Sequence, residues 1–479
     1  MNNTCDILIK NGNVIIPFNG IVKTNILIEN GKIKALKKTI GNVSTDRVIN
    51  AEDKYILPGI IDPHVHYGVF TPIESAAKTE SMSAVTGGIT TIMRMIRLDG
   101  SYRKIVNHLE VSRRTHITDY AIHASILDPS QIKEMSFLKS IGINSFKIYM
   151  NLGSELKKIL ADLDPGDTSL KEIEVDMSDG LLTEIIKMGS ALNSIILVHA
   201  EDHVECSRKM IEMRKRNEQV SSDLLKLWSS LRPESSEVNS IKKVLNIALD
   251  YEQNLYFVHI GSSQALNEIY RNKKLHQNLK IWIETCPHYL THTTDYDNIK
   301  GKVVPPLRSK GDLVELWNAI KSGIIDTIGT DHVANDLEIK KARGNFWNVP
   351  SGFSGLGTML PVMLSEGVNK KSIDLVRISE ICSANASRIF GFFPQKGTIM
   401  EGSDADLTIV DMEKEQRVSS DLLNSHSDYT IYEGWKLKGW PVMTIVRGKV
   451  VMEDGKVDQK NIGHGKFIET TKTRKDFKN

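Results

Sequence analysis

Two histidines that are two residues apart give the strongest chemical signal in the sequence. His64 and His66 lie in LPGIIDPHVHYG, residues 57–68. Alternate residues of a β-strand point to the same face, so both imidazoles of such a strand are directed at one point, as a metal ion requires. Two exposed or two core histidines would have the same spacing. The motif therefore predicts a metal site only if further ligands join it.

Further ligand-type residues end later apolar runs of the chain. His199 ends SIILVH, His259 ends LYFVH, and Asp331 follows DTIGT. In a parallel barrel the carboxyl ends of the strands share one face, so these side chains would converge although they are far apart in sequence. Their placement strengthens the prediction of a metal site at the end of the strand that carries His64 and His66.

Lys147, in INSFKIYM, is the least expected member of this group. An ammonium cannot bind a metal, and a lysine at a strand end ordinarily extends its amine toward water. A lysine that has reacted with carbon dioxide, however, carries a carbamate anion that can bridge two cations. Its position among the ligand strands makes Lys147 a candidate ligand.

The elements that must position these residues alternate between strand-like and helix-like segments. Helical patterns occur at 180–192 and 239–251, between apolar runs at 88–95, 120–127, 143–150, 194–201, 255–262, 279–286 and 326–332. This repetition over residues 57–395 predicts an α/β fold, a closed (β/α)8 TIM-like barrel, with a doubly wound open sheet as the alternative. No Gly-x-Gly-x-x-Gly follows a strand, which weakens that alternative.

Both ends of the chain have the texture of antiparallel β structure. Residues 1–56 and 396–457 contain short apolar runs separated by turn signals at Asn11-Gly12, Asn30-Gly31, Arg447-Gly448 and Asp454-Gly455. Two half-sheets left apart would expose their apolar faces and edges. The two ends are therefore predicted to form one small β-sandwich, followed by a tail at 458–479 whose last residues, TKTRKDFKN, are expected to be solvated.

Composition limits the partners and the compartment. The 479 residues include 61 Lys+Arg and 59 Asp+Glu, a net charge of +2, which argues against nucleic acid or a membrane surface as the main partner. No apolar run of 18 residues and no signal-peptide pattern occurs, so a cytoplasmic location is expected. The four cysteines are far apart and are expected to be buried rather than paired or bound to zinc.

The sequence resembles the cyclic-amide branch of the amidohydrolase superfamily, which contains hydantoinases, dihydropyrimidinases and allantoinases. The resemblance runs from about Asp6 to Val457. Besides the candidate ligands, the shared motifs are FKIYM, VHAED, ETCPHYL, VPPLRSK, SGFSGLGTMLP, KGTIMEGSDADLTIVD and YEGWKLKGWPV. Together these motifs are highly specific for the branch.

This resemblance implies a binuclear metal centre, with zinc as the expected metal. His64 and His66 would bind one ion, His199 and His259 the other, N6-carboxylated Lys147 would bridge them, and Asp331 would complete the first site. A hydroxide that bridges the metals would attack the ring amide of a small cyclic substrate, and Asp331 would carry the proton to the departing nitrogen. The resemblance also implies a homotetramer.

The substrate contacts of the family are replaced at three positions. Leu152 occupies the place of a tyrosine that supports the developing oxyanion, Val304 that of a ring-recognising serine, and Ser351 that of an asparagine. The stretch 152–180 is longer than usual and is expected to emerge on the catalytic face, where it would influence substrate choice.

Other interpretations remain open. Dihydroorotases of the related type carry an arginine after H-x-H that binds the substrate carboxylate, where this chain has Tyr67. A dihydroorotase-like enzyme is therefore an alternative that lacks this carboxylate contact. A non-catalytic scaffold related to dihydropyrimidinase would usually lack ligands that this chain keeps, and a mononuclear deaminase would leave the lysine idle. Core packing is expected for Tyr67, Tyr149 and His123, and loop positioning for His288 and His332.

Overall fold

The centre of the protein is a ring of parallel strands. The computed structural model describes residues 4–41, 43–216, 223–341 and 346–470. The strands pair in parallel with their neighbours in chain order. They are β6 (Ile60–His66), β7 (Ile89–Ile96), β8 (Asp119–Ser125), β9 (Ser145–Tyr149), β12 (Ile195–His199), β13 (Leu255–Phe257) and β14 (Ile281–Thr285).

One broken segment closes the ring. β15 (Thr327–Ile328) pairs with β14, and β16 (His332–Val333), a few residues later, pairs with β6 at the other end of the sheet. The eighth position of the barrel is therefore filled by residues 327–333, and the prediction of a closed TIM-like barrel is confirmed. Because Asp331 lies in this segment, the closure brings it beside the end of β6.

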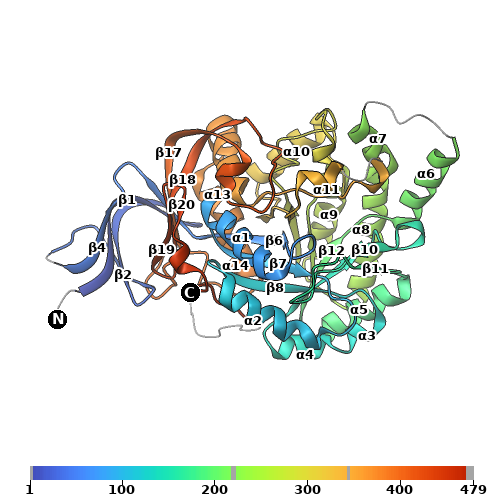
Figure 1. Cartoon of the computed structure of the whole chain (residues 1–479), viewed down its shortest axis with the longest axis horizontal. Coiled ribbons are helices and arrows are strands. Elements are labelled where there is room, and N and C mark those ends of the chain that lie inside the picture. The colour runs from blue at the N-terminus through green and yellow to red at the C-terminus, as the bar shows by residue number, and fades with distance from the viewer. Residues whose placement is uncertain (1–3, 42, 217–222, 342–345, 471–479) are drawn as a thin grey trace.

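Helices surround the strands on the outside of the barrel (Figure 1). The two segments predicted to be helical correspond to α5 (Asp179–Ala191) and to the C-terminal part of α8 (Glu234–Asp250). Side-chain caps fix several starts: Ser309, for example, forms a capping box with Asp312. The longer helices are α1 (Ile73–Thr86), α2 (Ile105–Thr115), α5 (Asp179–Ala191), α6 (His203–Arg216), α7 (Leu224–Leu231), α8 (Glu234–Asp250), α9 (Ser263–Leu275) and α10 (Lys310–Lys321). The shorter ones are α3 (Pro129–Ile132), α4 (Met135–Ser140), α11 (Leu337–Lys341), α12 (Met359–Val362), α13 (Leu375–Ser379) and α14 (Asn385–Ile389).

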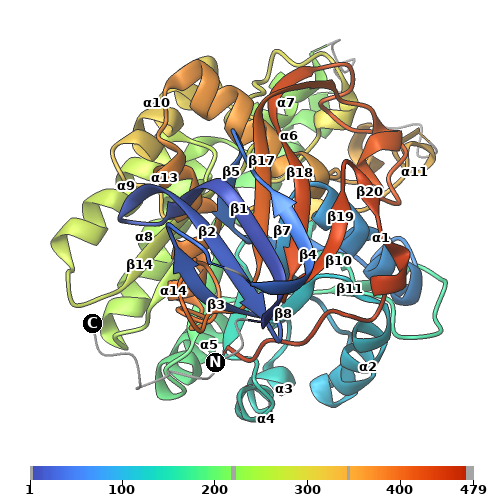
Figure 2. The same ribbon diagram turned by 90° about the vertical axis from the view of Figure 1, so that its left-hand side faces the viewer.

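The two chain ends come together beside the barrel, as predicted for the β-sandwich domain, and their strands form one mixed sheet (Figure 2). Strand β5 joins the halves, since it pairs in parallel with β1 and antiparallel with β17. A separate apolar core, which includes Ile9, Ile28 and Ile445, lies under this sheet. The strands are β1 (Thr4–Ile16), β2 (Gly20–Glu29), β3 (Lys32–Lys37), β4 (Ser44–Asn50), β5 (Tyr55–Pro58), β17 (Leu407–Arg417), β18 (Lys436–Val446), β19 (Lys449–Glu453) and β20 (Lys456–Val457).

One predicted turn in this sheet is wrong. The Asn11-Gly12 dipeptide lies inside β1, which continues to Ile16 with a register shift between Ile9 and Gly12. Asn11 has φ 64° and its backbone N–H donates to Asn25 at 3.1 Å, while a Cβ at Gly12 would lie 2.3 Å from Ile56 Cδ1. The pair therefore makes a bulge that lets β5 approach, rather than a hairpin. The other three predicted turns do connect adjacent strands.

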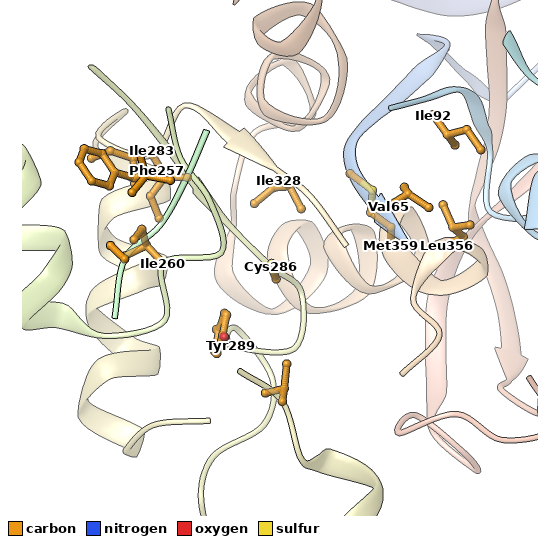
Figure 3. Packing of buried hydrophobic residues seen from close by; sticks show 14 of the residues in the cluster. Val65, Ile92, Phe257, Ile260, Ile283, Cys286, Tyr289, Ile328, Leu356 and Met359 are labelled. Atoms are coloured by element: carbon orange, nitrogen blue, oxygen red, sulfur yellow. The ribbon is translucent and has the colours of Figure 1, made fainter. Parts of the chain in front are cut away.

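Apolar side chains of successive strands form a large buried cluster together with residues of the surrounding helices. Figure 3 shows Val65 of β6, Ile92 of β7, Ile283 of β14 and Ile328 of β15 among the buried residues of one cluster. Burial of such side chains stabilises each by about 1.5–3 kcal/mol relative to exposure. This packing holds the strand ends, and therefore the candidate ligands, in fixed positions.

A buried group of charges joins the sandwich to the barrel. We call Asp119, Asp404, Asp406, Lys396 and Arg447 the junction cluster. Lys396 Nζ lies 2.6 Å from Asp119, 2.5 Å from Asp406 and 3.3 Å from Asp404, and Arg447 Nε lies 3.0 Å from Asp119. Asp119 belongs to barrel strand β8, whereas Asp404 and Asp406 precede sandwich strand β17. The cluster thus ties the two parts together through ion pairs.

The described part of the tail packs along the barrel. Ile468 donates its backbone N–H to Tyr120 at 2.7 Å, and Thr470 Oγ1 accepts from the Asn144 N–H at 2.7 Å. The segment TKTRKDFKN lies outside the described residues. All four cysteines are buried and free, as expected. Among the described residues, no helix has the length and apolar character needed to cross a membrane.

Candidate metal centre

The end of β6 and the segment after β15 bring three predicted ligands together. His64 Nε2 and His66 Nε2 are 3.2 Å apart, and Asp331 Oδ1 lies 3.2 Å from the first and 3.3 Å from the second. All three side chains are buried. Burial is the main reason that the pKa of each histidine lies well below its ordinary value, so both are neutral imidazoles, the form that binds metal. The arrangement is that of three donors around one cation.

The other two histidines predicted as ligands lie beside this group. His199 ends β12 and His259 follows β13, and their ring centroids are 4.6 Å apart. The His259 ring is also 5.3 Å from that of His64. His199 Nε2 is taken by Glu201 at 2.7 Å, which leaves Nδ1 as its free donor atom. The structure therefore places all four predicted histidines in one group.

Lys147 lies in the same group without a partner. Its side chain is fully buried in β9, and its Nζ has no hydrogen-bond partner among the residues that the structure describes. Nearby is the ring of Tyr149, whose centroid lies 5.2 Å from Nζ. Burial lowers the pKa of Lys147 to about 7. A buried amine that lacks an acceptor is costly, and conversion to a carbamate between cations would remove that cost. The residues present fit a bridged metal pair.

Two of the predicted ligands also have strained backbones. His259 has φ 42° and Asp331 has φ 49°, in the left-handed region that non-glycine residues seldom occupy. Such conformations cost about 1–3 kcal/mol and persist only where the surroundings impose them. Both occur where the chain turns away from a strand end. This strain at ligand positions supports a functional role for the cluster.

Buried carboxylates orient the ligands, and sequence reasoning missed them. Glu284 accepts from His64 Nδ1 at 2.8 Å and from the His259 N–H at 3.0 Å, as Glu201 accepts from His199. Such partners fix the orientation of a ligating imidazole. Burial raises the pKa of Glu284 to about 8. Cations bound nearby would act in the opposite direction and favour its ionised form. Glu201 and Glu284 lie in the motifs VHAED and ETCPHYL, but neither motif alone assigns them this contact.

A cavity of about 420 Å³ opens onto these ligands. This volume is within the range of small-molecule sites. Leu152, Val304 and Ser351, the three positions where the family contacts are replaced, all line it. The long connection after β9 also reaches the cavity, through Leu156 and strand β10 (Lys158–Leu160), which pairs with β11 (Glu172–Glu174).

The other singled-out residues have structural contacts. His123 hydrogen bonds Ser145 Oγ at 2.6 Å and the Pro63 carbonyl at 3.1 Å, and Tyr67 hydrogen bonds His116 at 2.8 Å. His332 bridges Glu80 and the Gly355 N–H, each at 3.0 Å, and His288 packs against Tyr289 and Phe353. Tyr149 is buried but also lines the cavity, and burial raises its pKa to about 12, so it keeps its proton.

Comparison with known proteins gives a consistent result. A family model described as the amidohydrolase family matches residues 55–451. The chain is 30% identical to the L-hydantoinase of Paenarthrobacter aurescens, over 98% of this chain and 99% of that protein. It is 31% identical to the D-hydantoinase of Ralstonia pickettii, over 94% and 96%. The L-hydantoinase (dihydropyrimidinase) structure from Arthrobacter aurescens superposes with a TM-score of 0.85 at 29% identity, covering 97% and 100%.

Proposed function

Because the chain belongs to the amidohydrolase family, we propose that it hydrolyses the C–N bond of a cyclic amide or ureide. Full-length similarity to hydantoinases supports this reaction class. L- and D-hydantoinases match about equally well, so the similarity does not favour either enantiomer. The observation that carries the proposal is the meeting of His64, His66 and Asp331 within 3.3 Å, beside buried Lys147.

We assign the metals, which we propose to be two zinc ions, by the position of each donor. His64, His66 and Asp331 would hold one, and His199 and His259 the other, with carboxylated Lys147 between them. When bound, such a pair lowers the pKa of a shared water and polarises the substrate carbonyl. The family match and the clustered His and Asp residues support a hydrolase that uses a divalent metal, whichever metal that is.

The environment of Lys147 supports its carboxylation. Its lowered pKa gives a substantial fraction of neutral amine near pH 7. The amine nitrogen attacks carbon dioxide to form an N–C bond, one proton is released, and the product is a carbamate anion. That exchange replaces a cation, which would repel two dications, by an anion that attracts them. Metal binding and carboxylation should therefore stabilise each other.

The chain's own residues can manage the proton and the substrate. Asp331, which faces both histidines of β6, can accept the proton lost by the attacking water and return it to the leaving nitrogen. Tyr149 presents a protonated phenol on the same cavity wall. We also propose that the 152–180 connection influences substrate choice. If shortening it left relative kcat/KM values unchanged across a substrate panel, that role would be excluded.

A hydrolysis screen tests the reaction class. The holoprotein should open at least one ring among dihydrouracil, hydantoins, allantoin, dihydroorotate and simple cyclic imides, with metal content measured in the same sample. A scaffold protein would bind little metal and open none of them, and a mononuclear deaminase would release ammonia with one metal per chain. We further propose a homotetramer located in the cytoplasm, the latter consistent with four free cysteines.

A further inference from the structure

Four basic side chains line the cavity besides Lys147, and three of them have a carboxylate or carbonyl oxygen within 3.5 Å. Lys158 pairs with a glutamate of the β10–β11 hairpin, Arg232 faces the carboxylate that orients His199, and Lys302 donates to main-chain carbonyls. The distances are 2.6 Å for Lys158–Glu172, 3.5 Å for Arg232–Glu201, 2.8 Å for Lys302–Phe346 and 2.9 Å for Lys302–Val349. Arg232 also has buried guanidinium nitrogens without a hydrogen-bond partner in the described structure, but its side chain is only 4% exposed. The fourth basic side chain, Arg97, lies farther from its carboxylate and is more exposed.

Arg97 directly follows β7 and has a weak side-chain partner. Its backbone N–H donates to Asp162 Oδ2 at 2.7 Å, but its guanidinium Nη2 is 3.9 Å from Oδ1, beyond hydrogen-bond distance. Nε is buried and has no hydrogen-bond partner within the described part of the chain. The side chain is 12% exposed and reaches the cavity. The guanidinium thus retains donors for another acceptor.

The charge of Arg97 is also not balanced. Asp162 lies closer to Arg94, whose Nη2 is 3.6 Å from Oδ2 and whose side chain is 1% exposed. Arg94 stacks on the Tyr67 ring at 4.6 Å and does not line the cavity. One buried carboxylate therefore serves two guanidinium groups, and Arg97 is the one that faces the substrate space.

Arg97 lies near the reaction centre. Arg97 lines the same cavity as His66 and Tyr149. Two acidic side chains also line the cavity, but Asp331 is turned to the histidines and Glu155 is exposed in the loop after β9. An anion on a substrate held at the metal ligands could reach the guanidinium.

We propose that Arg97 binds a carboxylate carried by the substrate, so that the ring opened by this protein is an anionic cyclic amide. The inference rests on the proposed hydrolysis and specifies its substrate class. A guanidinium can bind a carboxylate through two parallel hydrogen bonds, which gives both affinity and orientation. The sequence lacks an arginine after H-x-H, but Arg97 supplies the same chemistry from the next strand. Rings that carry a carboxylate, such as dihydroorotate, are therefore again candidate substrates.

A pair of matched substrates tests this assignment. Hydantoin-5-acetate and hydantoin-5-acetamide have nearly the same shape and differ in charge. Wild-type kcat/KM should favour the acid by about 10- to 100-fold, and Arg97→Met should remove that preference while keeping turnover of the amide. Lys158→Met, which removes a cavity cation that already has a partner, should keep the preference. Equal wild-type rates, or a preference that survives Arg97→Met, would overturn the inference and leave the hydrolase proposal standing.

Binding of the ring-opened acids separates this inference from the reaction itself. By calorimetry, wild-type holoprotein should bind N-carbamoylaspartate at least about tenfold more tightly than N-carbamoylasparagine, and Arg97→Met should bind both alike. This result would support the carboxylate site even if neither hydantoin were hydrolysed. Equal affinities of the wild-type protein for the two acids would refute the carboxylate site even if both hydantoins were hydrolysed.

Discussion

Two buried groups of ionisable side chains in this protein have similar composition and opposite character. The metal-ligand group and the junction cluster each place three donor atoms of His or Asp within 4.8 Å of one another. In the junction cluster the carboxylates are neutralised by Lys396 and Arg447, with Lys32 on the outer side of Asp404 at 2.7 Å. In the ligand group Lys147 has no acceptor within the described structure.

This difference supports our proposal that the ligand group is the functional one. A buried charge network that balances itself stabilises a junction and has no need of a further ion. A buried group of neutral imidazoles, an aspartate and an amine without an acceptor keeps unpaired polar atoms, which a bound cation and a carbamate would pair. Charge balance, rather than the number of acidic or imidazole groups, therefore distinguishes a metal site from a structural cluster.

Replacing Lys147 should have the largest effect. Lys147→Ala removes the proposed bridge, so metal content should fall and activity should drop at least about a thousandfold. A short-chain carboxylic acid should partly restore both in this variant. Lys147→Arg should not be rescued, because its guanidinium stays charged and fills the space. Metal analysis and kcat/KM are the readouts, and two metals with wild-type turnover in Lys147→Ala would contradict the assignment.

Replacing Lys396 should affect folding instead. Lys396→Met leaves buried carboxylates without their central cation, which should lower the free energy of unfolding by about 3–5 kcal/mol. Lys32→Met is the matched control, since this half-exposed lysine should contribute at most about 1 kcal/mol. Urea unfolding measures both. If folded Lys396→Met bound fewer metals than wild type, the two groups would not be independent.

Glu284 should matter through the imidazole that it orients. Glu284→Gln should weaken metal affinity by about 10- to 100-fold, measured by competition with a chelator. Glu80→Gln offers a comparison, because Glu80 also pairs with a buried histidine, His332, at 3.0 Å, but outside the predicted ligands. A similar loss of affinity in Glu80→Gln would show that the effect is not specific to the ligand group.

Asp404 gives the smallest expected effect, and it depends on pH. Burial acts to raise its pKa, but Lys396 and Lys32 hold it below the ordinary value near 3.8. A carboxylate with a lower pKa in the folded state contributes stability above the unfolded pKa and loses it as pH falls through the folded pKa. Asp404→Asn should therefore cost about 1 kcal/mol at pH 7, and its difference from wild type should shrink below pH 4. A constant difference from pH 7 to pH 3 in urea unfolding would exclude this contribution.

Sequence patterns predicted the fold because strand and helix periodicities were strong, and they pointed to the candidate ligands because these lie in or directly after barrel strands. The wrong or missing predictions also have physical reasons. Asn11-Gly12 has turn chemistry, but close packing against Ile56 makes it a bulge. The contacts of Glu284 and the imbalance around Arg97 depend on residues far away in the sequence, so no local pattern contains them.

The most direct test of the central claim is carbon-13 NMR of the holoprotein after equilibration with labelled bicarbonate, with metal counted in the same sample. One carbamate signal per chain, together with two metals, is predicted. Chelation should remove the metals and the signal together, because the anion at Lys147 is stabilised by the cations that it bridges. A fully active protein with two metals and no carbamate signal would contradict the account.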